Sequence, residues 1–260
     1  MNNSSTLTMK TTRSFLRLAL LAALTLLSSR FALSPCLAGT HTWTGASGDG
    51  KWSTAFNWAN NSPPVSGEAA PVVLQFPAAG TKNATNDLAT LMLDQLQITG
   101  DNYVIAGAGA GASVTLRSQT GLSSTFFISG ANAVLTNFNF TLATNINPYA
   151  SVSVGTGDTA TFRCQFTGPG GLIKRANGTL ILDGNAPNTY SGRTEIQGGT
   201  VRLSQSGVAV PGELVIGYSA LTNLASVELM TPNQVGDTAN VLVNCNGSFV
   251  PRVFNDTIGS

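Results

Sequence analysis

The sequence predicts an all-β fold built as a solenoid, in which successive coils stack strand upon strand. Charged residues make up only 10% of the 260 residues, whereas about 25% is usual for soluble domains. The chain carries 28 Gly, 31 Thr and 22 Asn, and its apolar residues recur in short runs with a period of two. Helical bundles and coiled coils are excluded, because acidic and basic helix formers are too scarce.

The charge balance excludes two further classes of protein. Intrinsic disorder requires low hydrophobicity with high net charge, whereas 42% of these residues are hydrophobic and the formal net charge is +1. The 13 basic residues are scattered among 12 acidic ones and make no basic field. Binding to nucleic acid is therefore not expected.

Residues 1–38 have the pattern of a secretory signal peptide. A basic segment precedes an apolar run at 18–27, and the small residues Cys36 and Ala38 suit cleavage after Ala38. The apolar run is shorter than the roughly 20 residues that a transmembrane helix needs. We expect a chain that is secreted or displayed on the outer cell surface, or periplasmic if it is not exported further, with no transmembrane segment after residue 38.

Residues 39–260 are predicted to form a single β domain. Short apolar or alternating segments are separated by Gly, Asn, Asp and Pro, and the connections are too short for crossover helices. An antiparallel sandwich and a solenoid therefore remain. We expect strands at 72–76, 91–98, 103–105, 114–116, 125–128, 133–142, 152–154, 161–166, 179–182, 194–196, 200–203, 214–216, 227–229, 241–243 and 249–253.

Turn chemistry favours the solenoid over the antiparallel β-sandwich, which stays the alternative. Residues 168–199 contain eight glycines in 32 positions, and the corners of a solenoid need the positive φ or close backbone approach that glycine tolerates. Stacking also places like residues about 4.8 Å apart. Columns of like charge are disfavoured at that spacing, so low charge is an expected consequence of the architecture.

One clear repeat lies at 168–203. Its landmarks are Gly170-Gly171-Leu172-Ile173-Lys174, Gly178-Thr179-Leu180-Ile181-Leu182, Asn188-x-Tyr190-x-Gly192-x-Thr194 and Gly199-Thr200-Val201-Arg202-Leu203. This pattern resembles the autotransporter-associated β-strand repeat, which implies a right-handed parallel β-helix of the passenger-like type found in secreted bacterial proteins. The sequence departs from the family pattern at Ala176-Asn177 and by a short insertion at Ala186-Pro187, both in expected turns.

Weaker similarity to such proteins covers 40–76 and 227–260, and the repeat itself implies no catalytic residue. Because the chain stops inside a segment that continues in similar proteins, we expect a solenoid truncated at its C-terminal end. The chain is then either a fragment of a larger secreted protein or a short passenger-like one. An uncapped end predicts end-to-end self-association.

All three tryptophans, Trp43, Trp52 and Trp58, lie within sixteen residues near the start of the mature chain. They are expected to cap the first coil. Contact with a glycan remains the alternative, because exposed indoles stack on sugar rings. Asp49, between Gly48 and Gly50, suggests a cation loop only weakly.

Two cysteines, Cys164 and Cys245, remain in the mature chain. An isolated pair in an oxidising compartment predicts one disulfide, and two free thiols are an equal alternative. Their separation gives no metal or redox signature.

The sequence shows no catalytic, cofactor-binding or metal-binding set. His41 is the only histidine and is expected in a mobile terminus, so no triad or zinc site is predicted. A polysaccharide lyase or hydrolase stays open, because stacked coils could place Asp158 beside Asp183, or Arg193 beside Lys174. The leading hypothesis is a non-enzymatic structural or adhesive protein, and binding to an extracellular polysaccharide is second.

Overall fold

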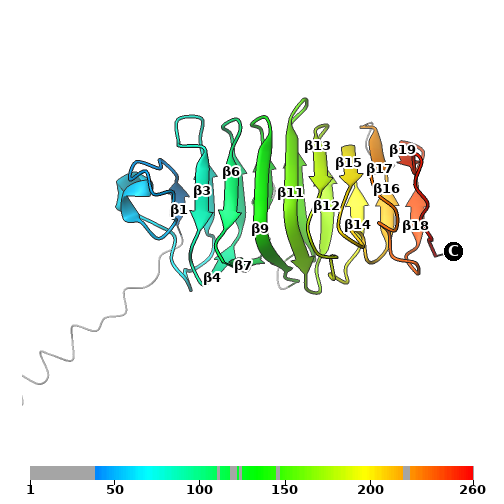
Figure 1. Cartoon of the computed structure of the whole chain (residues 1–260), viewed down its shortest axis with the longest axis horizontal. Helices are drawn as coiled ribbons and strands as arrows, with labels where there is room; N and C mark the ends of the chain where they lie inside the picture. Colours follow the sequence, from blue (N-terminus) through cyan, green and yellow to red (C-terminus); the bar gives the residue numbers. More distant parts are fainter. Residues whose placement is uncertain are drawn as a thin grey trace, which may run out of the picture. The chain divides into compact units, whose positions relative to one another are not determined.

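The computed structural model describes residues 39–109, 112–117, 122, 125–144, 147–218 and 223–259. The predicted signal peptide at 1–38 lies outside these ranges. Within them the chain is all β, apart from two 3-10 turns, η1 (Ala55–Asn57) and η2 (Ala59–Asn61). The strands form two parallel sheets that run along the stack (Figure 1).

Each coil after the first contributes strands to both sheets. The first sheet has nine strands, β1 (Thr40–Thr42), β2 (Val73–Phe76), β5 (Gln95–Ile98), β8 (Phe126–Ile128), β10 (Tyr149–Val154), β12 (Gly171–Arg175), β14 (Thr194–Ile196), β16 (Leu214–Ile216) and β18 (Val241–Val243). The second has ten, β3 (Asn83–Asn86), β4 (Thr90–Leu93), β6 (Val104–Gly107), β7 (Ala112–Leu116), β9 (Ala133–Leu142), β11 (Thr159–Thr167), β13 (Thr179–Leu182), β15 (Gly199–Leu203), β17 (Ala225–Leu229) and β19 (Gly247–Val250).

Paired strands are parallel and in register from coil to coil. In the repeat, for example, Leu180 of β13 pairs with Val201 of β15. Coil length is not constant, since Thr194 pairs with Leu214 across 20 residues and Leu96 with Phe126 across 30. The predicted parallel β-solenoid is confirmed, and the antiparallel sandwich is wrong.

Most of the predicted strands are present, and the exceptions share a physical cause. The sequence pattern missed β1, β3 and β12, each of which turns one polar or charged side chain inward: His41, Asn86 and Lys174 are buried. The segment predicted as one strand at 91–98 is two, β4 and β5, separated at the buried Asp94. Inward polar residues break the apolar alternation on which strand prediction depends.

The core is a continuous column of apolar side chains between the sheets. Strand β9 alternates buried and less buried positions on each side of a break at Thr136 and Asn137, as expected when every second side chain points inward. Aromatic rings pack against one another from coil to coil within the column. The ring centroids of Phe140 and Phe166 are 5.5 Å apart, and those of Phe126 and Phe162 are 5.0 Å apart.

Strand β9 of the second sheet has a bulge where it pairs with β11. Thr136 pairs with Arg163 and Asn139 with Gln165, so two residues of β9 face the single residue Cys164 of β11. Asn137 makes this possible, because it adopts a left-handed conformation (φ 59°) and its Nδ2 donates to the carbonyls of Gly107 and Gly109 at 2.7 and 2.8 Å. The bulge lets β9 pair first with β6 and then with β7.

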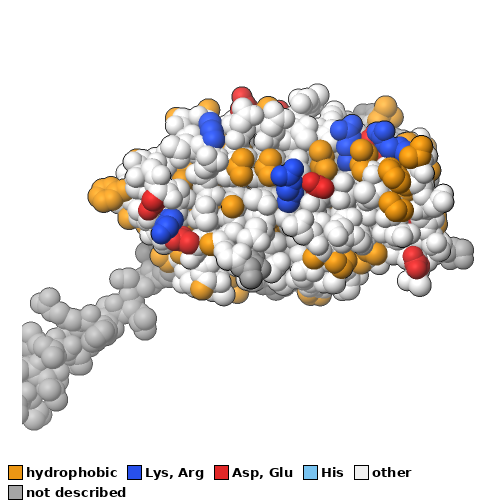
Figure 2. Space-filling model, in the orientation of Figure 1, with side chains coloured by type: hydrophobic (Ala, Val, Ile, Leu, Met, Phe, Trp, Pro, Cys, Tyr) orange, Lys and Arg blue, Asp and Glu red, His pale blue; other side chains and the backbone are white. Residues whose placement is uncertain are grey.

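The outer surface is poor in charge, as the composition predicts. On the face shown in Figure 2, a small number of charged side chains, several of them beside one another, lie among mostly neutral ones. Three ion pairs on this side of the stack are partly exposed: Arg163 pairs with Asp183, and Glu228 pairs with both Arg202 and Arg252. Hydrogen bonds from Arg252 and then Arg202 lower the pKa of Glu228.

Candidate functional site

The segment with the repeat buries one charged side chain inside the stack. Lys174, on β12, is 0% exposed, and its Nζ donates to the backbone carbonyls of Arg175, Ala176 and Gly198 at 2.8, 2.8 and 3.1 Å. Burial lowers the pKa of Lys174 to about 8, but the three acceptors match the three N–H donors of an ammonium group. Lys174 thus ties the turn after β12 to a turn of the following coil.

The departure at Ala176 from the family pattern lies in the turn that Lys174 closes. Ala176 has a φ of 59°, in the left-handed region that favours glycine. Its carbonyl is one of the three that Lys174 holds. The turn is therefore kept in place by the lysine although it lacks the usual glycine.

Tyr190, Gly192 and Thr194 form the Tyr-x-Gly-x-Thr landmark and pack closely within the segment that leads into β14. Tyr190 is 1% exposed, and its hydroxyl shares a hydrogen bond with the Oγ1 atom of Thr194. A Cβ atom on Gly192 would lie 2.4 Å from the backbone nitrogen of Gly171, so only glycine fits. These residues lie inside the coil and have a structural role.

At one corner of the later coils, side-chain oxygens of four residues accept hydrogen bonds from backbone N–H groups. We call this column the oxygen ladder. In each case the oxygen belongs to the coil that follows the N–H group. Asn188 accepts from Phe166 N, Gln205 from Gly184 N, Gln234 from Gln205 N and Asp256 from Gln234 N, at 2.7 to 2.8 Å. The ladder thereby satisfies N–H groups that a sharp corner removes from the sheets.

The sequence predictions included Asn188 as a landmark but missed Gln205, Gln234 and Asp256. A signal was present, because an amide or acid follows the second expected strand of these coils: 205 follows 200–203, 234 follows 227–229 and 256 follows 249–253. An amide side chain in a turn on a polar surface is expected to be exposed, so the sequence did not predict that these side chains are buried. The structure shows Gln205 and Gln234 to be 3% and 1% exposed.

The span that holds these landmarks has a counterpart among known families. Residues 172–203 match the passenger-associated-transport-repeat family. The chain carries this repeat. The resemblance predicted from 168–203 is thus confirmed over nearly the whole segment, and Lys174, Asn188, Tyr190 and Thr194 are the side chains that hold the repeat together.

Curated relatives resemble the chain over a longer stretch. The Neisserial autotransporter lipoprotein NalP of Neisseria meningitidis serogroup B, and the protein of the same name from serogroup B serotype 15, are each 38% identical over 104 residues. That stretch is 36% of this chain and 9% of each relative. No solved structure matches the chain. The chain is a β-solenoid that carries this passenger-associated repeat, and it spans only about 9% of the length of the autotransporters that it resembles.

Removing the ammonium group of the repeat tests its structural role. We expect Lys174→Met to lower the free energy of unfolding by about 1–3 kcal/mol, because three carbonyls lose their donor while the cost of burying the charge is recovered. Urea unfolding followed by circular dichroism measures the change. Lys51→Met, at an exposed lysine, is the control and should be neutral. Equal stability of the two variants would contradict the role of Lys174.

The three tryptophans form a buried cluster at the N-terminal end. Trp43, Trp52 and Trp58 are 0%, 1% and 2% exposed. The rings of Trp43 and Trp58 meet edge to face with centroids 5.1 Å apart, and Trp52 packs on Phe76 of β2 at 5.9 Å. The indole of Trp58 donates to the carbonyl of Trp52 at 2.7 Å. The cluster packs as a cap, and the alternative of sugar rings stacking on these indoles is wrong, because no indole face is exposed.

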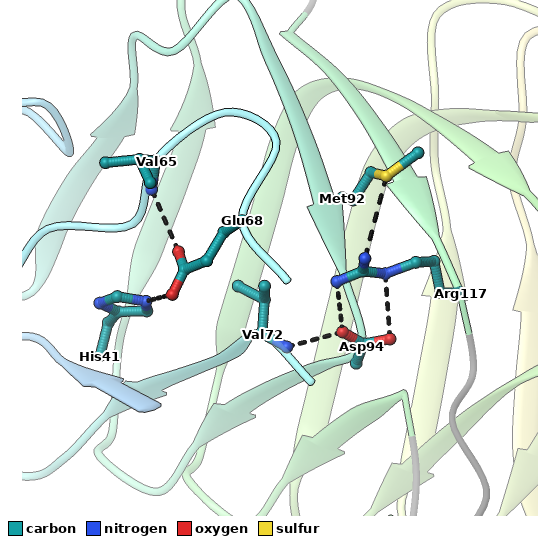
Figure 3. Close-up of polar contacts among 7 residues, drawn as sticks. All are labelled: His41, Val65, Glu68, Val72, Met92, Asp94 and Arg117. Atoms are coloured by element: carbon teal, nitrogen blue, oxygen red, sulfur yellow. Dashed lines mark hydrogen bonds and ion pairs between the residues drawn. The ribbon is translucent and has the colours of Figure 1, made fainter. Parts of the chain in front are cut away.

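His41 lies in β1 and is buried, so its expected place in a mobile terminus is wrong. Figure 3 shows the imidazole beside Glu68, whose Oε1 lies 2.8 Å from Nε2. On the other side of the ring, Nδ1 lies 2.9 Å from the carbonyl oxygen of Ser62. A carbonyl only accepts, so Nδ1 donates. The other carboxylate oxygen of Glu68 accepts from Val65 N at 3.2 Å. His41 therefore links β1 to the 62–68 loop.

A second buried ion pair, between Asp94 and Arg117, joins two neighbouring coils of the stack. Arg117 donates to both carboxylate oxygens of Asp94, at 3.1 Å from Nε and 2.6 Å from the terminal nitrogen (Figure 3). The Asp94 side chain is 0% exposed and that of Arg117 10%. Val72 N also donates to Asp94, at 2.6 Å. These contacts satisfy the buried polar groups at a corner of the stack. The sequence pattern did not predict the ion pair.

Asp49 serves as an acceptor for its own loop. Its carboxylate oxygens accept hydrogen bonds at 2.6 to 3.0 Å from four donors, which are Ser47 Oγ, Lys51 N, Thr54 Oγ1 and Asn57 Nδ2. Hydrogen bonds, the largest of them from Thr54, hold the pKa of Asp49 below its usual range. Four donors match the acceptor capacity of a carboxylate, so the contacts favour a structural role over the predicted cation loop.

The pKa of Asp49 gives the cap an acid dependence. Because the folded pKa lies below the unfolded value, the ionised carboxylate stabilises the fold above about pH 4 and this contribution is lost as the pH falls further. We expect the melting temperature of the wild type to fall more steeply below about pH 4 than that of Asp49→Asn. The exposed Asp237, substituted by Asn, is the control. Parallel profiles for wild type and Asp49→Asn would contradict the assignment.

The predicted disulfide between Cys164 and Cys245 is not formed, and both thiols are free. Cys164 points inward from β11 and its Sγ donates to the carbonyl of Leu135 at 3.3 Å, whereas Cys245 is exposed in the turn between β18 and β19. Burial raises the pKa of the Cys164 thiol. The alternative of two free thiols therefore describes the pair, with only Cys164 buried.

The stacked coils do not bring together the acids and bases considered for catalysis. Asp158 and Asp183 lie at different positions along the strands, since Asp183 pairs with Arg163 at 3.2 Å. Lys174 points inward, whereas Arg193 points outward and pairs with Glu195 at 3.0 Å. Both predicted juxtapositions are wrong. In the described ranges, no three His, Cys, Asp or Glu side chains are placed to hold a metal ion.

In the part of the chain that the structure describes, no helix is long and apolar enough to cross a bilayer.

Proposed function

We propose that this chain is a secreted passenger-like β-solenoid with a structural or adhesive role at the outer surface of a bacterial cell, and without catalytic activity. The repeat at 172–203 carries the proposal, because it matches a family described as passenger-associated. The similarity to proteins named autotransporters supports export to the cell surface.

The structure is consistent with a rigid display scaffold. The landmark side chains of the repeat hold one coil to the next, and the oxygen ladder continues that attachment through later coils. A stack of this kind depends on neighbour contacts and extends in one dimension. Such an architecture holds surface loops at fixed separations, which suits an adhesive or spacing role.

Protease treatment of intact cells tests the location. We expect an antibody to the chain to lose its signal after intact cells are treated with protease, while a periplasmic marker stays intact. Protection in intact cells, with release by osmotic shock, would contradict surface display. The adhesive role predicts that a deletion strain adheres less to polysaccharide-coated surfaces and that the intact gene restores adherence.

A further inference from the structure

The outer face of the second sheet carries a polar hollow of about 310 Å³ at the bulge between β9 and β11. Its volume is at the lower end of the range of small-ligand sites, which begins at about 300 Å³. The floor includes Phe138 and Cys164, both buried. Around this floor, the walls present hydroxyl, carboxamide and guanidinium groups.

The bulge explains why polar groups converge there. Thr136 and Arg163 pair on one side of the extra residue, and Asn139 and Gln165 pair on the other. In a regular parallel sheet these outward side chains would stand in parallel rows, but a bulge bends the strand and redirects them. Two pairs of polar side chains from adjacent strands therefore border one hollow.

The insertion that departs from the repeat pattern supplies another wall. Asn185 and Ala186 line the hollow, and Gln165 Nε2 donates to the carbonyl of Pro187 at 2.8 Å, which fastens the inserted turn to β11. The coil with the clearest repeat is thus modified at the point where it borders the hollow. A loop needed only to connect strands would not require this attachment.

The charge and hydrogen-bonding groups of the walls indicate the class of ligand. Arg163 is paired with Asp183, which neutralises the guanidinium while its side chain stays 55% exposed. Among the described residues, the carboxamides of Asn139 and Asn185 make no side-chain hydrogen bond, so each offers donors and an acceptor. Paired donors and acceptors without net charge suit the hydroxyl groups of a neutral sugar.

We propose that this hollow binds a saccharide unit of a neutral extracellular polysaccharide, through Asn139, Arg163 and Asn185. The inference rests on the proposed adhesive function and names its ligand class. It does not involve the tryptophans, which are buried.

Binding of defined oligosaccharides to the purified mature chain tests the proposal. The probes are maltohexaose, cellohexaose and N-acetylchitohexaose as neutral chains, with oligogalacturonate as an acidic one, measured by isothermal titration calorimetry. We expect at least one neutral probe to bind, and Asn185→Ala and Arg163→Ala each to weaken it by about fivefold to tenfold.

Matched variants separate a local effect from loss of the fold. Asn255→Ala removes an exposed carboxamide of the last coil, and Arg175→Ala removes an exposed guanidinium of the first sheet. Both should leave the affinity unchanged, and all four variants should melt within a few degrees of the wild type. Absence of binding to every neutral probe, preference for the acidic probe, or equal affinity in Asn185→Ala and Asn255→Ala would overturn the proposal.

Failure of the saccharide-binding test can be distinguished from failure of the protease test of surface display. A surface-exposed chain that binds no neutral probe would overturn only the saccharide site. Conversely, saccharide binding by a chain that is protected from protease in intact cells would overturn surface display and leave the site standing.

Discussion

Trp58→Ala is expected to lower the free energy of unfolding at the N-terminal end by about 3–5 kcal/mol, the usual cost of truncating a buried tryptophan. The indole is 2% exposed, packs against four aromatic rings including those of Trp43 and Phe76, and donates a hydrogen bond to the carbonyl of Trp52. Its loss removes both the packing and the donor. Because the stack is held by neighbour contacts, the damage should be largest in the first coils.

Fluorescence provides the measurement, since all three tryptophans lie in this cap. The emission of the two that remain should change at lower urea concentration than the circular dichroism of the whole stack. Phe56→Ala, at a side chain that is 68% exposed in η1, is the control and should change stability by less than about 0.5 kcal/mol. Saccharide binding at the bulge should persist in Trp58→Ala under native conditions. A variant that lost binding at unchanged stability would contradict the structural role of the cap.

Asp94→Ala is the second substitution with a large expected effect, a loss of about 3–5 kcal/mol. Arg117 would remain with an unpaired guanidinium that is 10% exposed, and Val72 N would lose its acceptor. Removing both charges should be less harmful than removing one. The double variant Asp94→Leu with Arg117→Met is therefore expected to recover much of the loss.

An exposed ion pair of the same chain provides the matched comparison. Asp183→Ala removes the partner of Arg163, where the two side chains are 36% and 55% exposed, and should cost no more than about 1 kcal/mol. Urea unfolding of the three variants measures the difference. A similar loss for Asp94→Ala and Asp183→Ala would contradict the account of Asp94 as a buried, corner-forming group.

The fold could be predicted from sequence because its determinants are local. Period-two alternation located most strands, and glycine-rich turns with scarce charge distinguished a stack of coils from other β folds. The strands that were missed contain residues such as Lys174 and His41, whose burial depends on partners far away in the sequence. Alternation alone cannot indicate that an inward lysine will meet three carbonyls.

The candidate site was harder to predict for the same reason. Asn185 and Gln165 are unremarkable polar residues in the sequence, and they border one hollow only because a bulge at Asn137 bends the second sheet. The insertion at Ala186-Pro187 was visible as a departure from the repeat, but its meaning depended on the bond from Gln165 to Pro187. The free state of the cysteines likewise depends on their placement, because Cys164 faces inward from β11 whereas Cys245 lies in an exposed turn.

The oxygen ladder bears on how such a protein can change over evolutionary time. Successive members are separated by 17, 29 and 22 residues, yet the side-chain contact between neighbouring coils is preserved. The length of a loop can therefore change without loss of the hydrogen bonds that attach one coil to the next. A gene of this kind can gain or lose codons in the loops, and so acquire new recognition surfaces, while the attachment of each coil to its neighbour is inherited unchanged.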